Sequence, residues 1–268
     1  MSFVPAKWDK SANLRRIERM SRLAAARGAK VLITPEGALE GYVINEVITG
    51  GPALETRFMQ IAEPTAGQVI EKVKHLCTEI KVNLLLGFLE KDGDVLYNSS
   101  AWINSQGRIL YVHRKTHMFQ PYYQLEFYHP GDEISAFDTD FGRFGIMICF
   151  ERQIPEIATV LALDGAEVIF NPSYGSRGKW NHTLLKARAR DNNVFLVFTH
   201  PKQTMIINPS GEILGNRNNR PGITYAELNL NGPDYEKLSK RRPQVFIDKL
   251  SKRLHSRSNS KKGNTLAS

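Results

Sequence analysis

The sequence has few of the features that mark disulfide-rich or membrane-spanning proteins. It contains only two cysteines, Cys77 and Cys149, which argues against a disulfide framework and favours a reducing compartment. No apolar run approaches the roughly 18 residues that a membrane span needs, and the first residues lack a cationic and apolar leader. We therefore expect a cytoplasmic protein with no membrane partner.

The motifs of several enzyme classes are also missing. There is no Gly-x-Ser-x-Gly elbow of a serine hydrolase, and Gly178-Lys179 lacks the upstream glycine and the following hydroxyl of a phosphate loop. His113 and His117 have a spacing that suits zinc on a helix, but their segment leaves an apolar strand and no third ligand lies nearby. We expect no metal and no cofactor.

Positive charge is concentrated at the end of the chain. The last twenty residues contribute six positive charges to the net charge of +9, so the remainder is only mildly basic. Residues 251–268 contain many serines and few apolar side chains, which predicts a disordered basic tail after one domain that spans residues 1–250. No aromatic platform or nucleic-acid motif accompanies the charge, so we do not expect nucleic-acid binding.

Helical and strand-like apolar patterns alternate along the chain, which indicates a layered α/β protein. We expect helices at residues 9–28, 67–81, 155–164 and 179–191. We expect strands at residues 31–33, 82–89, 95–103, 109–113, 144–148, 166–170, 193–199, 204–207 and 223–228.

Three reactive side chains, Glu36, Lys115 and Cys149, each follow the end of an apolar strand. Ligands bind at the carboxyl ends of strands in open α/β sheets, and neighbouring strand ends can converge there. A free cysteine is more often a core residue than a nucleophile, so Cys149 alone is weak evidence. Its position at the start of a helix favours the thiolate, and the two charged partners strengthen the catalytic interpretation.

These three groups have complementary roles in attack on a carbonyl or nitrile carbon. A carboxylate such as Glu36 can accept the proton of a thiol. An ammonium and a backbone amide can stabilise the negative charge that develops on the substrate, and the candidates are Lys115 and the N–H of Phe150. The aromatic loop after Lys115 is expected to be functional, because long loops of this kind rarely act as simple connectors.

The same residues resemble a known family. The segments that resemble the three signature blocks of the nitrilase superfamily of carbon–nitrogen hydrolases are residues 35–42, 111–117 and 145–156. Glu126, followed by Pro-Gly-Asp at residues 130–132, matches the second glutamate of the family. The resemblance covers residues 13–246 and departs at the start, where residues 1–5 supply only a stub of the family's first strand.

This resemblance implies a four-layer αββα sandwich that pairs through its helices into a homodimer or a larger oligomer. Its metal-free site would use Glu36 to take the thiol proton and Cys149 to attack. Lys115 and the Phe150 amide would hold the tetrahedral intermediate, while Glu126 would orient Lys115 and the substrate amide. After ammonia or an amine leaves, water activated by Glu36 would hydrolyse the thioester.

The residues after the nucleophile favour an amidase or carbamoylase over a nitrilase. Aliphatic nitrilases commonly have Trp-Glu after the cysteine, where this chain has Phe-Glu. Arg152 resembles an arginine that engages the substrate carboxylate in carbamoylase-type members, and a structural ion pair with Glu151 or Glu156 is an equal alternative. The other expected substrate contacts are Tyr42, Phe150 and Asn171.

Taken together, these features predict hydrolysis of a small linear amide, such as an N-carbamoyl amino acid, with water as the second substrate. A nitrilase that acts on a small nitrile is one alternative. A catalytically silent binding or scaffold protein that keeps the fold is another, and the presence of Glu36, Lys115 and Cys149 argues against it.

Overall fold

The computed structural model describes residues 1–175 and 177–230, together with residues 232, 236, 239, 240, 242, 244 and 245. The chain divides into two compact units, Met1–Pro233 and Asp234–Ser268, and the fold below is that of the first unit. The predicted tail at residues 251–268 lies outside the described residues. The domain boundary at residue 250 and the disorder of the tail therefore stay predictions.

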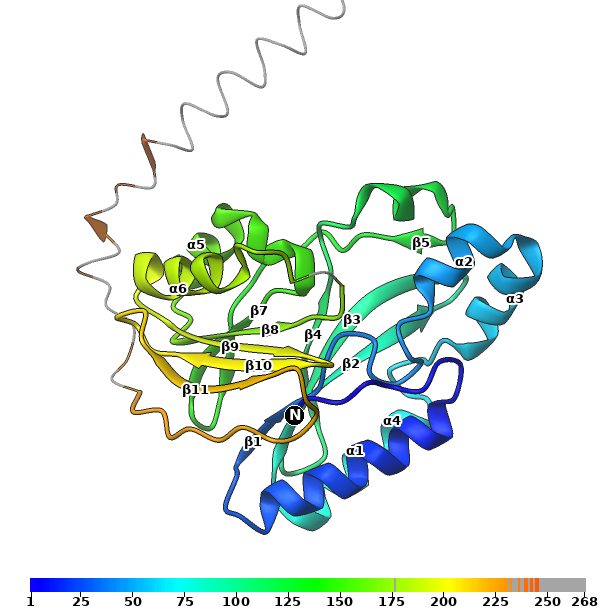
Figure 1. Cartoon of the computed structure of the whole chain (residues 1–268), viewed down its shortest axis with the longest axis horizontal. Helices are drawn as coiled ribbons and strands as arrows, with labels where there is room; N and C mark the ends of the chain where they lie inside the picture. Colours follow the sequence, from blue (N-terminus) through cyan, green and yellow to red (C-terminus); the bar gives the residue numbers. More distant parts are fainter. Residues whose placement is uncertain are drawn as a thin grey trace, which may run out of the picture. The chain divides into compact units, whose positions relative to one another are not determined.

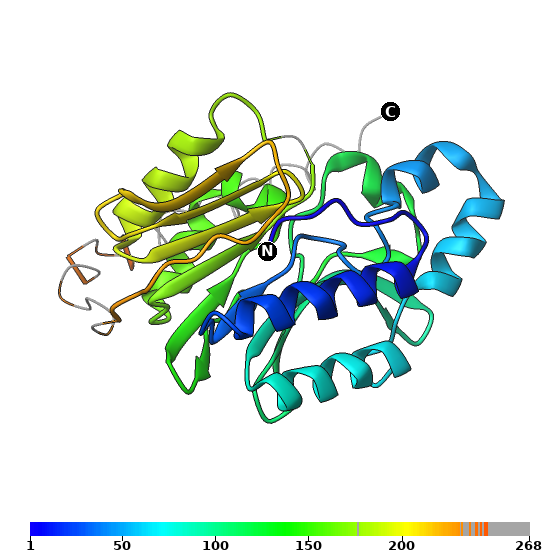
Figure 2. The ribbon, with the colours of Figure 1, turned by 60° about the horizontal axis from the view of Figure 1, so that its bottom comes forward.

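The first sheet has five strands, and α1 and α4 cover one of its faces (Figures 1 and 2). Its strands are β1 (Val31–Ile33), β2 (Asn83–Asp92), β3 (Val95–Ile103), β4 (Ile109–Arg114) and β5 (Tyr128–His129). The order is β1-β2-β3-β4 with β5 paired to β3, and β1 is parallel to β2. The helices are α1 (Lys10–Ala25), which Asp9 caps, and α4 (Gln68–Ile80).

The second sheet has six strands, and α5 (Pro155–Leu163) and α6 (Asn181–Asn192) lie along its outer face (Figure 1). Its strands are β6 (Phe137–Thr139), β7 (Gly142–Ile146), β8 (Val168–Pro172), β9 (Phe195–His200), β10 (Gln203–Ile207) and β11 (Ile213–Asn218). They follow the order β11-β10-β9-β8-β7-β6, and β7, β8 and β9 are parallel. The carboxyl ends of these three strands therefore lie at one edge of the sheet.

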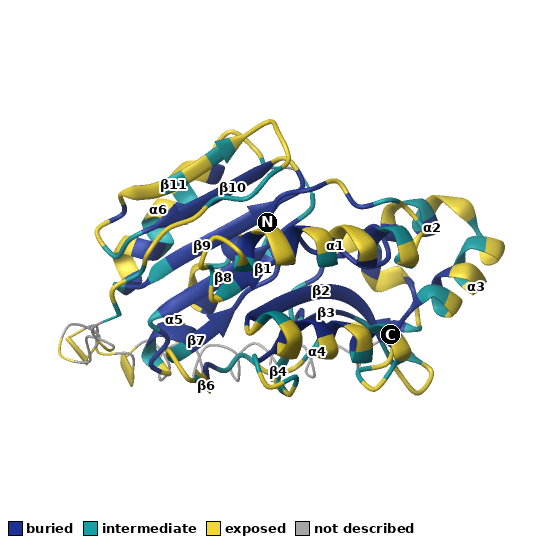
Figure 3. Cartoon of the chain, turned by 90° about the horizontal axis from the view of Figure 1, so that it is seen from below, coloured by how far each residue is buried: buried dark blue, intermediate teal, exposed yellow. Residues whose placement is uncertain are grey.

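The inner faces of the two sheets pack against each other. Side chains alternate along β2, so Leu84 and Leu86 face the helices while Leu85 joins the core between the sheets. In that core, Trp102 of β3 contacts aromatic rings of the second sheet at centroid distances of 5.4–5.6 Å. Figure 3 shows the buried strands between more exposed helices, and the predicted αββα sandwich is confirmed. Pairing into an oligomer stays a prediction.

The first residues connect the two sheets. The amino group of Met1 donates to the carbonyl of Ile33 at 2.7 Å, and Thr199 Oγ1 of β9 donates to the carbonyl of Met1 at 2.6 Å. Ser2 and Gly222 form an antiparallel bridge. In the part of the chain that the structure describes, no helix is long and apolar enough to cross a membrane.

The predicted helices and most predicted strands are present within a few residues of their expected ends. The strand predicted at residues 223–228 is wrong, because this segment packs Ile223 and Leu228 against the core without joining a sheet. The edge strand is β11 instead, which a tight turn at Asn208–Gly211 holds against β10. Only Ile213 and Leu214 at its start are apolar, and the rest of the strand is Gly-Asn-Arg-Asn, so β11 lacks the alternating apolar pattern of a strand. Two short helices, α2 (Ile44–Gly50) and α3 (Pro52–Ile61), were not predicted.

Candidate active site

Glu36 lies just beyond the end of β1, where the chain runs against β2. Thr34 Oγ1 accepts a hydrogen bond from the N–H of Gly87 at 2.8 Å, and this contact holds the end of the strand in place. A Cβ atom on Gly87 would lie 2.4 Å from the carbonyl oxygen of Pro35, so only glycine permits this approach. The side chain of Glu36 is fully buried as a result.

Lys115 follows the end of β4 and is held through its backbone. Its N–H donates to the carbonyl of Asn98 at 2.8 Å, and its carbonyl accepts from the N–H of Gly131 at 2.9 Å. A Cβ on Gly131 would lie 2.3 Å from the carbonyl of Arg114, so this loop also needs a glycine for its close approach. The backbone contacts fix the direction of a long side chain that is 2% exposed.

Glu36 and Lys115 form a buried ion pair at the centre of the site. Lys115 Nζ donates to Glu36 Oε1 at 2.8 Å, and Asn98 Nδ2 donates to the same oxygen at 2.8 Å. Burial by itself lowers the pKa of Lys115, but the negative charges of Glu36 and Cys149 outweigh it and raise the pKa above its ordinary value. Glu36 Oε2 is buried and has no hydrogen-bond partner among the residues that the structure describes. This oxygen is therefore available to accept a proton from a bound group.

Cys149 begins the short 3₁₀ helix η2 (Cys149–Gln153), one turn after β7. Its φ of +48° lies in the left-handed region, which non-glycine residues seldom adopt, so the turn is strained at the sulfur-bearing residue. The turn is held by the carbonyl of Met147, which accepts from Asn171 Nδ2 at 2.6 Å. The sulfur of Cys149 lies 3.7 Å from a terminal nitrogen of Arg152, and the charge of Cys149 contributes to the raised pKa of Lys115.

The two cysteines should therefore react differently with iodoacetamide. Cys77 lies in the core under α4, and burial raises its pKa to about 12. Cys149 lies at the strand ends beside Lys115, so we expect it to be alkylated faster. Mass spectrometry of peptides after timed labelling of the native protein measures both rates, and labelling after unfolding provides the control. Equal rates in the native protein would contradict the placement of Cys149.

Glu151 ties the lysine segment to the nucleophile turn. Its Oε1 accepts from the N–H and the Oγ1 of Thr116, each at 2.7 Å, and its Oε2 contacts His113 Nε2 at 2.9 Å and the N–H of Ile148. Burial alone would raise the pKa of Glu151, but His113 and these donors lower it to about 2. The charged carboxylate therefore holds the Lys115 and Cys149 segments together.

His113 is a partner of Glu151, and no three His, Cys, Asp or Glu side chains among the described residues are grouped to hold a metal ion.

Aromatic side chains line the other side of the ion pair. Tyr42 adopts a φ of +52° and stacks on Tyr174 at a centroid distance of 4.4 Å. The hydroxyl groups of Tyr42 and Tyr122 are 3.2 Å apart, which brings the aromatic loop to the site. Burial, followed by the charges of Glu36 and Cys149, raises the pKa of Tyr42 well above its ordinary value. The predicted contact residue Tyr42 therefore lies beside the candidate catalytic groups.

The structure leaves the side chain of the predicted second glutamate, Glu126, in solvent, and its role in orienting Lys115 stays a prediction. The side chain of Glu126 is exposed, whereas that of the preceding Leu125 is buried among aromatic residues. A second carboxylate does lie near Glu36, but it belongs to Glu40, which sequence reasoning missed. Burial raises the pKa of Glu40 to about 7, and Leu89 donates its N–H to Oε2 of Glu40 at 3.0 Å.

Arg152 is buried next to the nucleophile and is committed to protein groups. Its Nε donates to Asn181 Oδ1 at 2.7 Å, and one terminal nitrogen donates to the carbonyl of Cys149 at 2.6 Å and lies 3.7 Å from the sulfur. The predicted partner Glu151 is bound to His113 and Thr116 instead. Phe150 is half-buried on the nucleophile turn.

Asn171 and Asn98 hold the framework of the site. The amide of Asn171, a predicted substrate contact, is bound to the carbonyl of Met147 and to Ser173. Asn98 was not predicted, although a run of Asn and two Ser inside an otherwise apolar strand was a detectable signal, because buried polar groups need specific partners.

A sequence model described as carbon–nitrogen hydrolase matches residues 3–232, which is most of the chain and contains all three reactive residues. The chain belongs to the carbon–nitrogen hydrolase family. The expected membership of the nitrilase superfamily is thereby confirmed, and with it the assignment of the protein as a carbon–nitrogen hydrolase.

Relatives of this carbon–nitrogen hydrolase include proteins named as amidases. An omega-amidase of Bos taurus is 28% identical over 265 residues, covering 89% of this chain and 88% of the relative. An N-carbamoylputrescine amidase of Solanum tuberosum is 34% identical over 169 residues, covering 62% of this chain and 54% of the relative. A hydrolase of Schizosaccharomyces pombe is 29% identical over 246 residues, covering 82% and 72% of the two chains.

The fold of this carbon–nitrogen hydrolase is similar to that of a solved amidase from Nesterenkonia sp., with a TM-score of 0.76 at 19% identity. The likeness covers 92% of this chain and 94% of that one. A variant of the Nesterenkonia amidase carries the acetamide moiety of fluoroacetamide covalently added at its active-site cysteine.

Proposed function

We propose that this protein hydrolyses small linear amides, in particular an N-carbamoyl amino acid or a related amide, through a cysteine thioester. The observation that carries the proposal is the buried Glu36–Lys115 ion pair, in which one carboxylate oxygen has no partner, next to Cys149. Relatives that act as an omega-amidase and as an N-carbamoylputrescine amidase support an amide or ureide substrate over a nitrile.

In the first half of the reaction, Glu36 takes the thiol proton and the sulfur of Cys149 attacks the carbonyl carbon. The resulting oxyanion accepts hydrogen bonds from Lys115 Nζ and from the N–H of Phe150. The proton on Glu36 then passes to the amide nitrogen. The C–N bond breaks, ammonia leaves, and the acyl group remains on sulfur.

In the second half, water attacks the thioester carbon while Glu36 accepts one of its protons. The second tetrahedral intermediate collapses, the C–S bond breaks, and the thiolate regains the proton from Glu36. A simple amide yields a carboxylic acid. A ureido substrate yields a carbamic acid, which loses carbon dioxide to leave the amine. The site needs no oxidant, reductant or metal for these steps.

Ammonia release over a panel of compounds tests the proposal. We expect release from small amides and N-carbamoyl amino acids without added metal, and we expect a chelator such as EDTA to leave the rate unchanged, because every step uses side chains of this protein. A coupled glutamate dehydrogenase assay measures the ammonia. If EDTA abolished the activity and a divalent cation restored it, the proposed site would be contradicted.

The same panel separates the alternatives. Release from small nitriles with no release from the corresponding amides would support a nitrilase instead. No product from any class, in a protein that is folded by circular dichroism, would support a silent binding protein. The homo-oligomer and the cytoplasmic location stay predictions from the sequence.

A further inference from the structure

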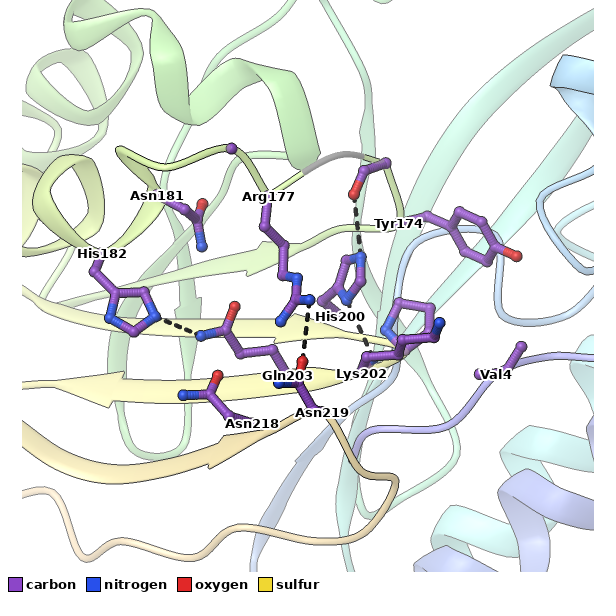
Figure 4. Close-up of a pocket in the computed structure, with 13 residues that line it drawn as sticks. Val4, Tyr174, Arg177, Asn181, His182, His200, Lys202, Gln203, Asn218 and Asn219 are labelled. Carbon is purple, nitrogen blue, oxygen red and sulfur yellow. Dashed lines mark hydrogen bonds between the residues drawn. The ribbon is translucent and has the colours of Figure 1, made fainter.

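A cavity lies beside the candidate active site. It has a volume of about 750 Å³ and lies between the segment after β8, the start of α6 and the β9–β10 hairpin (Figure 4). We call it the hairpin cavity. Its lining includes Gly175, Arg177, Asn181, Lys202 and Gln203.

The hairpin cavity adjoins the nucleophile through two of its lining residues. Gly175 lines the cavity, and a Cβ atom on it would lie 3.9 Å from Cys149 Sγ, so this part of the cavity wall lies next to the sulfur. Asn181 accepts a hydrogen bond from Arg152, whose terminal nitrogen lies 3.7 Å from the same sulfur. The cavity is therefore close to Cys149 Sγ in two places. Gly175 of its wall lies next to the sulfur, and Asn181 of its wall is connected to the sulfur through Arg152.

The charges that line the hairpin cavity are all of one sign. The half-buried Arg177 and the exposed Lys202 line it, and no aspartate or glutamate is among the described residues of the lining. Within the described residues, neither cation forms an ion pair with a carboxylate, and Arg177 donates only to the amide oxygen of Asn219, at 3.2 Å. His200 adds no positive charge near neutral pH, because burial lowers its pKa to about 4. Two cations without carboxylate partners favour an anionic ligand.

A buried amide nitrogen on the wall of the cavity, Asn181 Nδ2, lacks an acceptor among the described residues. Asn181 is 2% exposed, and no described residue accepts a hydrogen bond from its Nδ2, although its Oδ1 is bound to Arg152. Figure 4 shows this amide among the side chains that line the cavity. A buried donor without an acceptor costs free energy, so a bound oxygen at this position would satisfy it.

We propose that the hairpin cavity binds a carboxylate at the end of the substrate opposite to the scissile amide. Arg177 and Lys202 supply the positive charge, and Asn181 Nδ2 donates to the carboxylate or to the chain next to it. This inference rests on the proposed amidase function and makes it more specific: the substrate is an acid amide or ureido acid, and not a neutral amide or a ureide with a cationic end. It also assigns the carboxylate to residues other than Arg152, whose guanidinium is already bound to the protein.

Matched substrate pairs test the inference. Succinamate and butyramide differ only in a terminal carboxylate, and so do N-carbamoyl-β-alanine and propylurea. We expect kcat/KM to be higher for the acid of each pair, and we expect the variant Arg177→Gln/Lys202→Gln to reduce the acid-to-neutral ratio by about 10- to 100-fold, as loss of charge-assisted hydrogen bonds implies. Lys179 lies two residues after Arg177 but does not line the cavity. Lys179→Gln is therefore the matched control, and it should leave the acid-to-neutral ratio unchanged.

Binding of succinate, measured by isothermal titration calorimetry, gives a readout that does not depend on turnover. The double variant should lose succinate binding, whereas Lys179→Gln should retain it. Hydrolysis of neutral amides with no preference for the acids, or an equal ratio in the double variant, would overturn the carboxylate assignment and leave the amidase proposal standing. Loss of succinate binding in the double variant of a protein that hydrolyses no amide would support the cavity and sink the amidase proposal.

Discussion

Replacing Cys149 by alanine is expected to abolish amide hydrolysis, with a loss on the order of 10⁴-fold or more in kcat. The proposed reaction forms a bond from carbon to this sulfur, and no neighbouring side chain can replace it in the strained turn at φ +48°. Ammonia release from succinamate measures the loss. Mass spectrometry of the wild-type protein mixed rapidly with substrate should detect the acyl adduct on the Cys149 peptide, and the variant should show none.

The control for this substitution is Cys77→Ala. Cys77 lies in the core under α4, away from the ion pair, so its replacement removes one sulfur from the protein without touching the site. We expect a modest loss of stability and full activity. If the Cys149→Ala variant kept more than about a tenth of the wild-type rate, the thioester route would be untenable, since covalent catalysis requires the nucleophile.

Replacing Glu36 by glutamine should impair both catalysis and folding. The glutamine cannot accept the thiol proton, so we expect kcat to fall on the order of 10³-fold. It also leaves the buried ammonium of Lys115 without its counterion at 2.8 Å, which should lower the free energy of unfolding by about 3 kcal/mol. Ammonia release and urea denaturation measure the two effects separately.

Two further variants separate the chemical role of Glu36 from its structural one. Glu36→Gln/Lys115→Met removes both charges, so most of the stability should return while activity stays lost. Glu63→Gln breaks a second ion pair, with Lys10 of α1 at 2.6 Å, and should leave activity intact. Recovery of activity in the double variant would contradict the role of Glu36 as the base.

The exposure of Glu126 illustrates why the burial of residues in loops is hard to predict from sequence. Glu126 follows η1 (Gln120–Gln124), in a segment without a regular period, so no pattern predicts which side chain faces inward. In the structure the inward position belongs to Leu125, which packs with Tyr122 and Tyr128. The neighbouring carboxylate of Glu126 is left in solvent.

Residues that hold the framework were missed for a related reason. Asn98 contacts Glu36 across 62 positions in the sequence, and Glu40 reaches the N–H of Leu89 across 49. Such partners are chosen by the pairing of β1 with β2 and of β2 with β3, and pairing between strands is not encoded in local periodicity. The role of Glu151 as a link between two segments depends on the same pairings.

The sequence by itself determined the layered α/β class, the family and the positions of Glu36, Lys115 and Cys149 at strand ends, because apolar runs and the turns that end them are local properties of the chain. Only the tertiary structure decided that Lys115 bonds to Glu36, that Arg152 is bound to the protein, and that a cationic cavity forms beside the nucleophile. These features join segments far apart in the chain, and which side chains meet there depends on how the sheets pair and pack.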